Sequence, residues 1–180
     1  ASTTVPVIVY SATTVTATAD VLTGCSPLST TLHALSTPNV APNLYSFVGS
    51  VGTFTPITGT TVTLGADDDG YTGNLPIGFS FSYNGTTSSV FAVSPNGWLE
   101  IGQAGSATSG FFGNSLNTVA SKISPFWDDN NMAGGTIQYL TVGNTLTVQW
   151  LGMHVAGSGS TTNPTIDMQA ILDGSTGSIT

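Results

Sequence analysis

Apolar residues recur at every second position along much of this chain, and this period of two constrains the fold more than any other feature. Ile77, Phe79, Phe81 and Tyr83 alternate with glycine and serine, and residues 1–21 show the same alternation with threonine. Successive side chains of a strand point to opposite faces, so the pattern predicts strands with one buried face. We find no long helical pattern.

Two short turns are each expected to join a pair of strands. SVFAVS and GWLEIG are joined through Pro95-Asn96-Gly97, and TIQYLTV and TLTVQW flank Gly143-Asn144. Asn-Gly pairs tolerate the positive φ of a tight hairpin. The predicted inward positions of the later strands are Ile137, Tyr139, Leu146, Val148, Trp150, Ile166, Met168, Ala170 and Leu172. Many short strands with glycine-rich turns predict an all-β fold, a two-sheet antiparallel β-sandwich of jelly-roll type.

The chain is expected to have two parts. Residues 1–43 form a β-prone, strand-rich N-terminal extension that ends in a connector rich in Pro, Ser and Thr, and residues 44–180 form the sandwich domain. Prolines exclude the connector from a central strand. Only Ser178-Ile179-Thr180 follow the last predicted turn, so we expect the polypeptide to continue beyond them.

The charge of the chain excludes several kinds of partner. Charged residues make up 6% of the sequence, the formal net charge is -8, and Lys122 is the only basic side chain. Phosphate backbones and anionic lipid surfaces are bound by clusters of Lys and Arg, so no nucleic acid partner is expected. No apolar run approaches the roughly 18 to 20 residues of a membrane span, so no membrane insertion is expected. Cys25 stands alone, and we interpret it as an inert thiol.

The succession of motifs YSF, FTPITG, DDGY, LPIGFSFSYNG, VSPNGWLEIG and ISPFWDD resembles a secreted β-sandwich module of Bacteroidota-type extracellular surface proteins. Many proteins that carry this module are substrates of type IX secretion. The resemblance covers roughly residues 44–180 and implies an extracellular or cell-surface location. Such modules occur in adhesins, surface filaments and accessory parts of secreted hydrolases, so the resemblance implies location better than activity.

Two groups of aspartates are candidate ligands for Ca²⁺. Asp67, Asp68 and Asp69 precede Gly70, and Asp128-Asp129 follow Trp127. Calcium prefers several oxygen ligands and a glycine at the bend, although the spacing of an EF-hand is absent. A turn rich in Asp and Gly, with no ion, is the preferred interpretation, and Ca²⁺ is the one cofactor left open.

Catalysis is not expected. His33 and His154 lie far apart in sequence, and the chain has no GxSxG nucleophile motif. Glycosidases need two carboxylates, and the plausible members of such a pair are Glu100 with Asp128 or Asp129. The Trp-Asp-Asp sequence is interpreted as structural.

The candidate ligand-binding residues are Trp98 and the adjacent pair Phe111-Phe112. Aromatic rings on an open face stack on sugars, whereas a core position is the better interpretation for most large aromatics. Two adjacent Phe side chains cannot both face inward on a strand, so one is expected to be exposed or covered by another chain. Asn84-Gly85-Thr86 fits a glycosylation sequon, but a tight turn is preferred.

The sequence therefore predicts a non-catalytic extracellular structural or adhesive module, such as a subunit of a surface filament. The expected partners are further copies of the chain or other surface proteins. In the sharper form of this hypothesis, the strand that contains Val5, Val7 and Val9 completes the sheet of a neighbouring subunit. The alternative is a carbohydrate-binding module of a larger secreted protein or hydrolase, with polysaccharide as its ligand.

Overall fold

The computed structural model describes residues 6–8, 15–19, 32–36, 44–107, 121–155 and 162–180. By its internal contacts the chain divides into two compact units, Ala1–Gly52 and Thr53–Thr180. The boundary at residues 43 and 44 that we expect from the sequence stays a prediction.

The described part of the N-terminal unit consists of two antiparallel strand pairs. Strand β1 (Pro6–Ile8) pairs with β4 (Leu44–Ser46), and β2 (Val15–Ala19) pairs with β3 (Leu32–Ser36). In the sequence, β2 and β3 lie between β1 and β4. The pairing register of β2 with β3 is shifted by one residue from the register of β1 with β4. A two-stranded sheet is marginally stable on its own in water. These strands therefore benefit from any further strand or surface that covers them.

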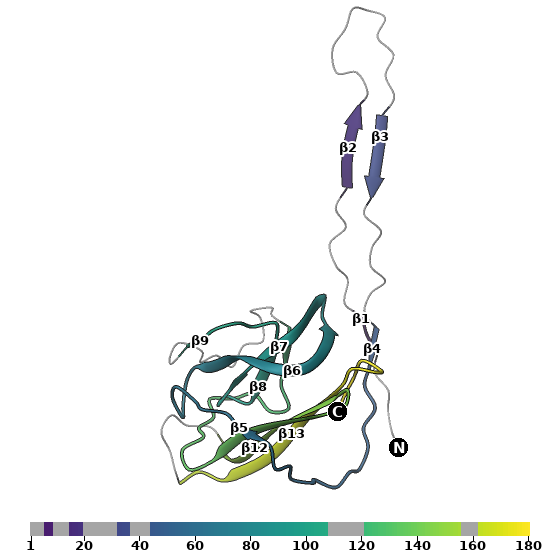
Figure 1. Ribbon diagram of the computed structural model, residues 1–180. Helices are drawn as coiled ribbons and strands as arrows, with labels where there is room; N and C mark the ends of the chain where they lie inside the picture. Colours follow the sequence, from purple (N-terminus) through teal and green to yellow (C-terminus); the bar gives the residue numbers. More distant parts are fainter. Residues whose placement is uncertain (1–5, 9–14, 20–31, 37–43, 108–120, 156–161) are drawn as a thin grey trace, which may run out of the picture. The chain divides into compact units, whose positions relative to one another are not determined.

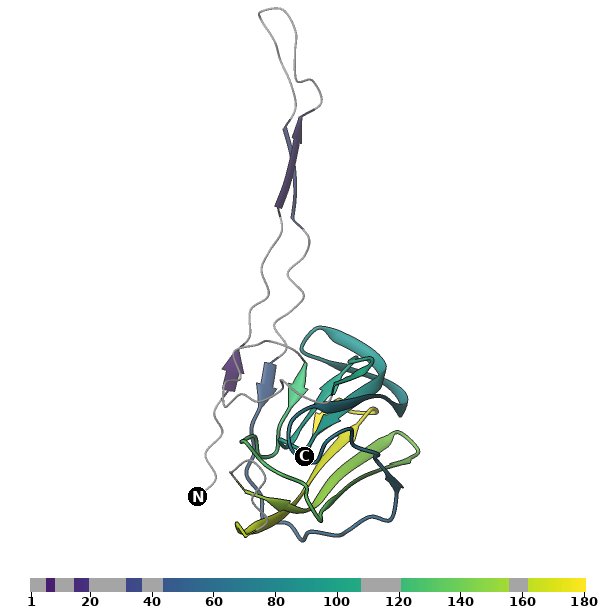
Figure 2. The ribbon, with the colours of Figure 1, turned by 90° about the vertical axis from the view of Figure 1, so that its left-hand side faces the viewer.

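The larger unit contains two antiparallel sheets packed face to face (Figures 1 and 2). In its described part, sheet I has the strand order β10-β8-β7-β6-β9, and sheet II has the order β14-β13-β12-β11-β5. The strands of sheet I are β6 (Tyr71–Tyr83), β7 (Thr86–Ser94), β8 (Trp98–Ile101), β9 (Ser106–Ala107) and β10 (Lys122–Ile123). The strands of sheet II are β5 (Thr60–Thr61), β11 (Thr136–Val142), β12 (Thr145–His154), β13 (Thr165–Asp173) and β14 (Ser178–Ile179).

The predicted β-sandwich is confirmed. Its connections run mainly within each sheet, because β6, β7 and β8 are sheet neighbours and so are β11 to β14. Both predicted turns are present, between β7 and β8 and between β11 and β12. A jelly roll is built from two Greek keys. The strands described here are joined mainly by hairpins within one sheet, so their order is simpler than that of a jelly roll.

One hydrophobic core lies between the two sheets. The predicted inward positions are confirmed: all are buried except Phe79, Tyr83, Tyr139 and Ile166, which are partly buried and pack against the core. The Trp150 indole also donates from Nε1 to the Ser94 carbonyl oxygen at 2.9 Å, which satisfies its polar atom inside the core.

A row of three glutamines crosses the outer face of sheet II. Gln138, Gln149 and Gln169 are neighbours on β11, β12 and β13. Gln149, which is fully buried, donates from Nε2 to the Ile57 carbonyl oxygen at 2.8 Å and accepts from the Ile57 N–H at 3.0 Å. Gln169 donates to the Thr55 carbonyl oxygen at 2.8 Å. The row thus holds the segment that leads into β5 against the sheet.

Candidate functional site

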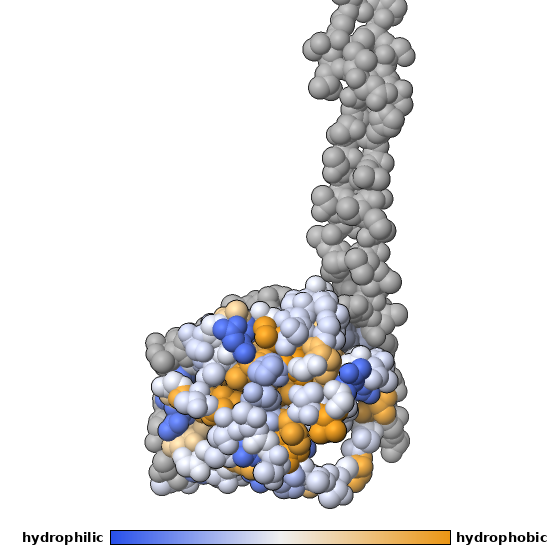
Figure 3. Space-filling model, in the orientation of Figure 1, coloured by the Kyte–Doolittle hydropathy of each residue, from blue (hydrophilic) through white to orange (hydrophobic). Residues whose placement is uncertain are grey.

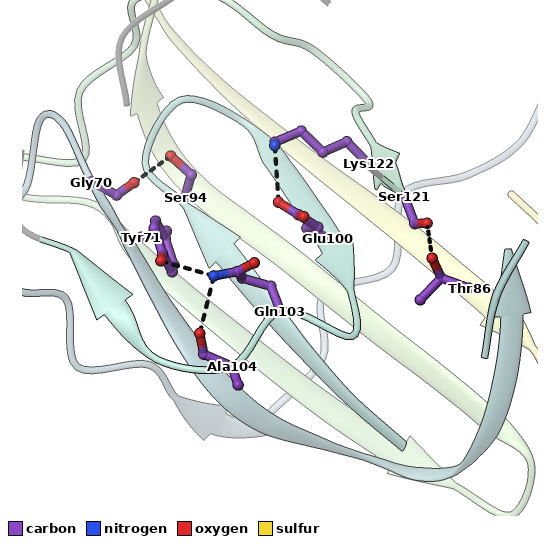
Figure 4. Close-up of polar contacts among 9 residues, drawn as sticks. All are labelled: Gly70, Tyr71, Thr86, Ser94, Glu100, Gln103, Ala104, Ser121 and Lys122. Carbon is purple, nitrogen blue, oxygen red and sulfur yellow. Dashed lines mark hydrogen bonds and ion pairs between the residues drawn. The ribbon is translucent and has the colours of Figure 1, made fainter. Parts of the chain in front are cut away.

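The outer face of sheet I carries Trp98 and Glu100, on which several sequence predictions depend, and Figure 4 shows Glu100 beside Lys122. Along β8 the side chains alternate, so Leu99 and Ile101 join the core while Trp98 and Glu100 lie on the opposite face. The alternation that predicts the strand therefore also brings these two residues to one side.

An ion pair joins two neighbouring strands on this face. Lys122 on β10 lies opposite Glu100 on β8, with Nζ 2.9 Å from Oε2. The two side chains are only 8% and 12% exposed. Lys122 is the only basic residue of the sequence and Glu100 its only glutamate. An ionised pair with so little exposure must be held closely together to offset its lost hydration.

The Trp98 ring is enclosed by its neighbours. It is fully buried, and Lys122 Nζ lies 4.7 Å from the ring centroid, within the range of a cation–π contact. The Tyr71 and Trp127 rings lie 6.0 Å and 6.4 Å away. Trp98, a candidate for ligand binding from the sequence, therefore presents no exposed ring on which a sugar could stack.

Beside the ion pair the same face has a polar pocket of about 310 Å³. Its polar wall consists of Asn84, Thr86, Glu100, Gln103 and Ser121. The Ser121 hydroxyl donates to Thr86 Oγ1 at 2.6 Å. Sequence reasoning singled out Glu100 but missed the pocket, because its other residues come from three separate segments of polar, unremarkable sequence.

Gln103 is fixed at the edge of this pocket through its nitrogen. Nε2 donates to the Tyr71 hydroxyl at 2.8 Å and to the Ala104 carbonyl oxygen at 3.0 Å. These two bonds determine the orientation of the whole amide group, and Figure 4 draws its oxygen on the side turned toward Glu100.

The structure brings together three of the five aspartates proposed as calcium ligands. Carboxylate oxygens of Asp68, Asp69 and Asp129 lie within 4.8 Å of one another. Burial raises the pKa of Asp129, and the negative charges of Asp68, Asp69 and Asp128 raise it further. These three carboxylates could hold a cation, but clustered acidic groups also occur without one. Calcium binding stays a prediction.

The other two aspartates each accept a backbone N–H. Asp128 accepts the Asp129 N–H through Oδ1 at 2.8 Å, and the Asp67 carbonyl oxygen accepts the Met132 N–H at 2.7 Å. Both contacts are hydrogen bonds that shape loops.

Two buried asparagines join the loops that carry the acidic cluster. Asn96 accepts the Asn130 N–H through Oδ1 at 2.9 Å and donates from Nδ2 to Asp69 Oδ1 at 3.4 Å. Asn96 and Asn130 are both fully buried. The sequence shows Asn96 only as half of a turn pair, and no local signal predicts its contacts across more than 25 residues.

The remaining enzymatic candidates lie in separate surroundings. His154 Nδ1 lies 3.0 Å from the Asn163 carbonyl oxygen, and His33 lies on β3 in the other unit. Of the carboxylates considered for a hydrolase, Asp129 lies in the cluster with Asp68 and Asp69. Glu100 is paired with Lys122.

Asn84 and Gly85 form the tight turn preferred from the sequence. Their φ values are 47° and 80°, in the left-handed region that a two-residue hairpin needs.

Several predicted site residues lie outside the described part of the chain. Phe111 and Phe112 belong to the connection between β9 and β10, and Val5 and Val9 flank β1. Val7 lies in β1, opposite Tyr45 of β4.

Two packed antiparallel sheets define this chain as an all-β sandwich protein. The chain belongs to the NIDO-related family, whose model matches residues 44–180. This is a non-enzymatic family of domains typical of extracellular proteins.

No curated protein and no solved structure matches the chain significantly. Within the described residues there is also no helix with the length and hydrophobicity needed to cross a bilayer.

Proposed function

We propose that this chain is a non-catalytic structural or adhesive module outside the cell, which associates with further copies of itself as the subunit of a surface filament does. Its family membership supports the extracellular and non-enzymatic part of the proposal. Export by the type IX pathway, implied by the sequence resemblance, belongs to the same proposal.

The observation that carries the proposal is a run of exposed apolar side chains between residues 47 and 54, within a stretch of sequence that has no charged residue. Phe47, Val48, Val51 and Phe54 are 75%, 68%, 104% and 40% exposed. Residues 21–66 contain no Asp, Glu, Lys or Arg. Exposed apolar groups favour contact with another surface, and no charged side chain of this stretch would have to be desolvated in that contact.

The larger unit has few charged side chains, and most of them are acidic. The face of the sandwich shown in Figure 3 is mostly white and orange, and its blue, hydrophilic areas are few and separate. Lys122, the only basic side chain, is occupied by its ion pair. Few charges on such a surface would need to be desolvated when copies associate.

The strand pairs of the N-terminal unit offer a second route to association. In the described residues, β2 and β3 form a sheet of two strands, so each has one edge without a neighbouring strand. Uncharged edges accept further strands readily. The edge of β1 that does not face β4 is the edge through which donation to a neighbouring subunit would occur.

The test compares the oligomeric state of the wild-type chain with that of a Phe47→Ser/Val48→Ser variant. Light scattering after size exclusion, with electron microscopy, should show oligomers or filaments for the wild type and monomers for the variant. Val142→Ser is the matched control, because Val142 is 68% exposed at the β11–β12 turn. A wild-type chain that stays monomeric at high concentration would refute the proposal.

A further inference from the structure

The pocket on the outer face of sheet I is lined mainly by polar side chains, and self-association through apolar surfaces does not explain them. Its volume of about 310 Å³ lies at the lower end of the range for small-molecule sites, about 300 to 1,000 Å³. Hydroxyl, amide and carboxylate groups all contribute to its wall. The ligand must therefore be small and polar.

Glu100 supplies an acceptor that is fixed in place. Lys122 Nζ binds Oε2, which holds the carboxylate in one orientation and leaves Oε1 as an acceptor for a ligand. The positive charge of Lys122, 2.9 Å from Oε2, balances the carboxylate and would repel a second cation. The ion pair thus favours a neutral ligand that donates hydrogen bonds.

Gln103 supplies a second fixed acceptor. Its Nε2 is used by Tyr71 and Ala104, so the atom left for a ligand is Oε1. Because the amide is held by two bonds, little side-chain entropy is lost when a ligand binds.

The two hydroxyl groups of the pocket complement these acceptors. Ser121 donates its proton to Thr86 Oγ1, which leaves the Thr86 proton for an acceptor on the ligand. A ligand that fits must both donate and accept hydrogen bonds at closely spaced positions. Adjacent hydroxyl groups on one small molecule do this.

From these contacts we infer that the pocket binds a neutral polyhydroxylated ligand, a single saccharide unit. The inference does not depend on the proposed self-association. Recognition occurs through hydrogen bonds alone, because the nearby Trp98 ring is buried and cannot stack on the sugar. Without stacking, the expected affinity is in the millimolar range.

The test uses the full chain and ligand-observed NMR titration. The neutral probes are glucose, galactose, mannose and N-acetylglucosamine, and the charged probes are glucosamine and glucuronate. At least one neutral sugar should bind, and its charged counterpart should bind more weakly. Absence of binding by all four neutral sugars at tens of millimolar, or tighter binding of glucosamine than of glucose, would overturn the inference.

Two variants locate the binding. Gln103→Leu and Glu100→Gln should each weaken the affinity about tenfold, as expected for the loss of one good hydrogen bond. Asn144→Ala, in the β11–β12 turn, is the control and should bind like the wild type. Circular dichroism checks the folding of each variant. If Glu100→Gln does not fold because Lys122 loses its partner, Gln103→Leu decides, and unchanged binding by that variant would place any sugar site elsewhere.

Discussion

Lys122 Nζ lies 2.9 Å from Glu100 Oε2 and 4.7 Å from the centroid of the Trp98 ring. The only basic side chain of the protein is thus nearly buried between an anion and an aromatic face on the outer side of sheet I. This position gives the residue a role in joining β10 to β8.

Removing Lys122 should destabilise the sandwich. In Lys122→Met the Glu100 carboxylate stays nearly buried without its partner, and breaking such a pair costs about 3 kcal/mol. Urea unfolding of the variant measures the change. The double variant Lys122→Met/Glu100→Gln should recover part of the loss, because it leaves no unpaired charge. If the double variant is as unstable as the single one, packing on Trp98 rather than charge accounts for the effect.

Gln149→Leu should lower the free energy of unfolding by about 2 kcal/mol. Leucine has nearly the same size, but it leaves both the N–H and the carbonyl oxygen of Ile57 without their bonds to Gln149. Thermal unfolding and urea unfolding both measure this change. The control is Val142→Ala beside the exposed β11–β12 turn, which should change stability by less than about 0.5 kcal/mol.

Two glycines with nearly the same φ provide a test of close packing. Gly97 has φ 77° and Gly85 has φ 80°. A Cβ at Gly97 would lie 1.9 Å from the Phe126 carbonyl oxygen, whereas a Cβ at Gly85 would have nothing within 4 Å. Gly85→Ala should therefore cost only the backbone strain, about 1 kcal/mol. Gly97→Ala should cost several times more or prevent folding, as measured by urea unfolding. Equal costs would show that the β7–β8 turn does not pack on Phe126.

Asp129 should make stability fall as the pH rises. Burial, with the charges of Asp68, Asp69 and Asp128, raises its pKa in the folded state above the ordinary 3.8. The folded state therefore binds this proton more tightly than the unfolded state. The resulting stabilisation is complete below pH 3.8 and is lost as the pH rises through the folded-state pKa. Asp129→Asn should remove this decline when urea unfolding is followed from about pH 3 to pH 7.

The control for this measurement has the opposite sign. Hydrogen bonding by the Ser175 N–H lowers the pKa of Asp173, so its stabilisation is present above the unfolded pKa and is lost as the pH falls. Asp173→Asn should therefore lose stability at neutral pH and approach the wild type in acid. If Asp129→Asn and Asp173→Asn changed the pH dependence of stability in the same direction, the opposite pKa shifts assigned to the two residues would be wrong.

The calcium prediction is tested on the same cluster of Asp68, Asp69 and Asp129. If the cluster binds Ca²⁺, saturating ion should raise the Tm by about 5 to 10 °C, and chelator should reverse the rise. Asp129→Asn should abolish most of this response. An unchanged Tm would identify the cluster as a plain acidic turn.

The strands and their inward faces could be predicted because they depend on local sequence. Ile77 and Phe81 lie in the core because alternate side chains of a strand share one face. Asn96-Gly97 turns the chain because glycine tolerates positive φ. The strand order was harder to predict. Alternation reports which face of a strand is buried but not which strand lies beside it.

The site depended on contacts that no local pattern reports. Sequence reasoning grouped Glu100 with the aspartates because all are carboxylates, whereas the structure pairs it with Lys122 across two strands. Trp98 stands next to a turn, as exposed binding residues often do, but its ring lies against Tyr71 and Trp127. Such pairings follow from sheet register and loop packing, which a single sequence does not contain.

The glutamine row also determines how the sandwich would respond to a pulling force. Tension applied to the chain ahead of Thr53 enters the larger unit through residues 55–61, where it meets the side-chain bonds of Gln149 and Gln169 before it reaches the β5–β11 ladder. If the module bears load as we propose, those side-chain bonds would break before the β5–β11 ladder.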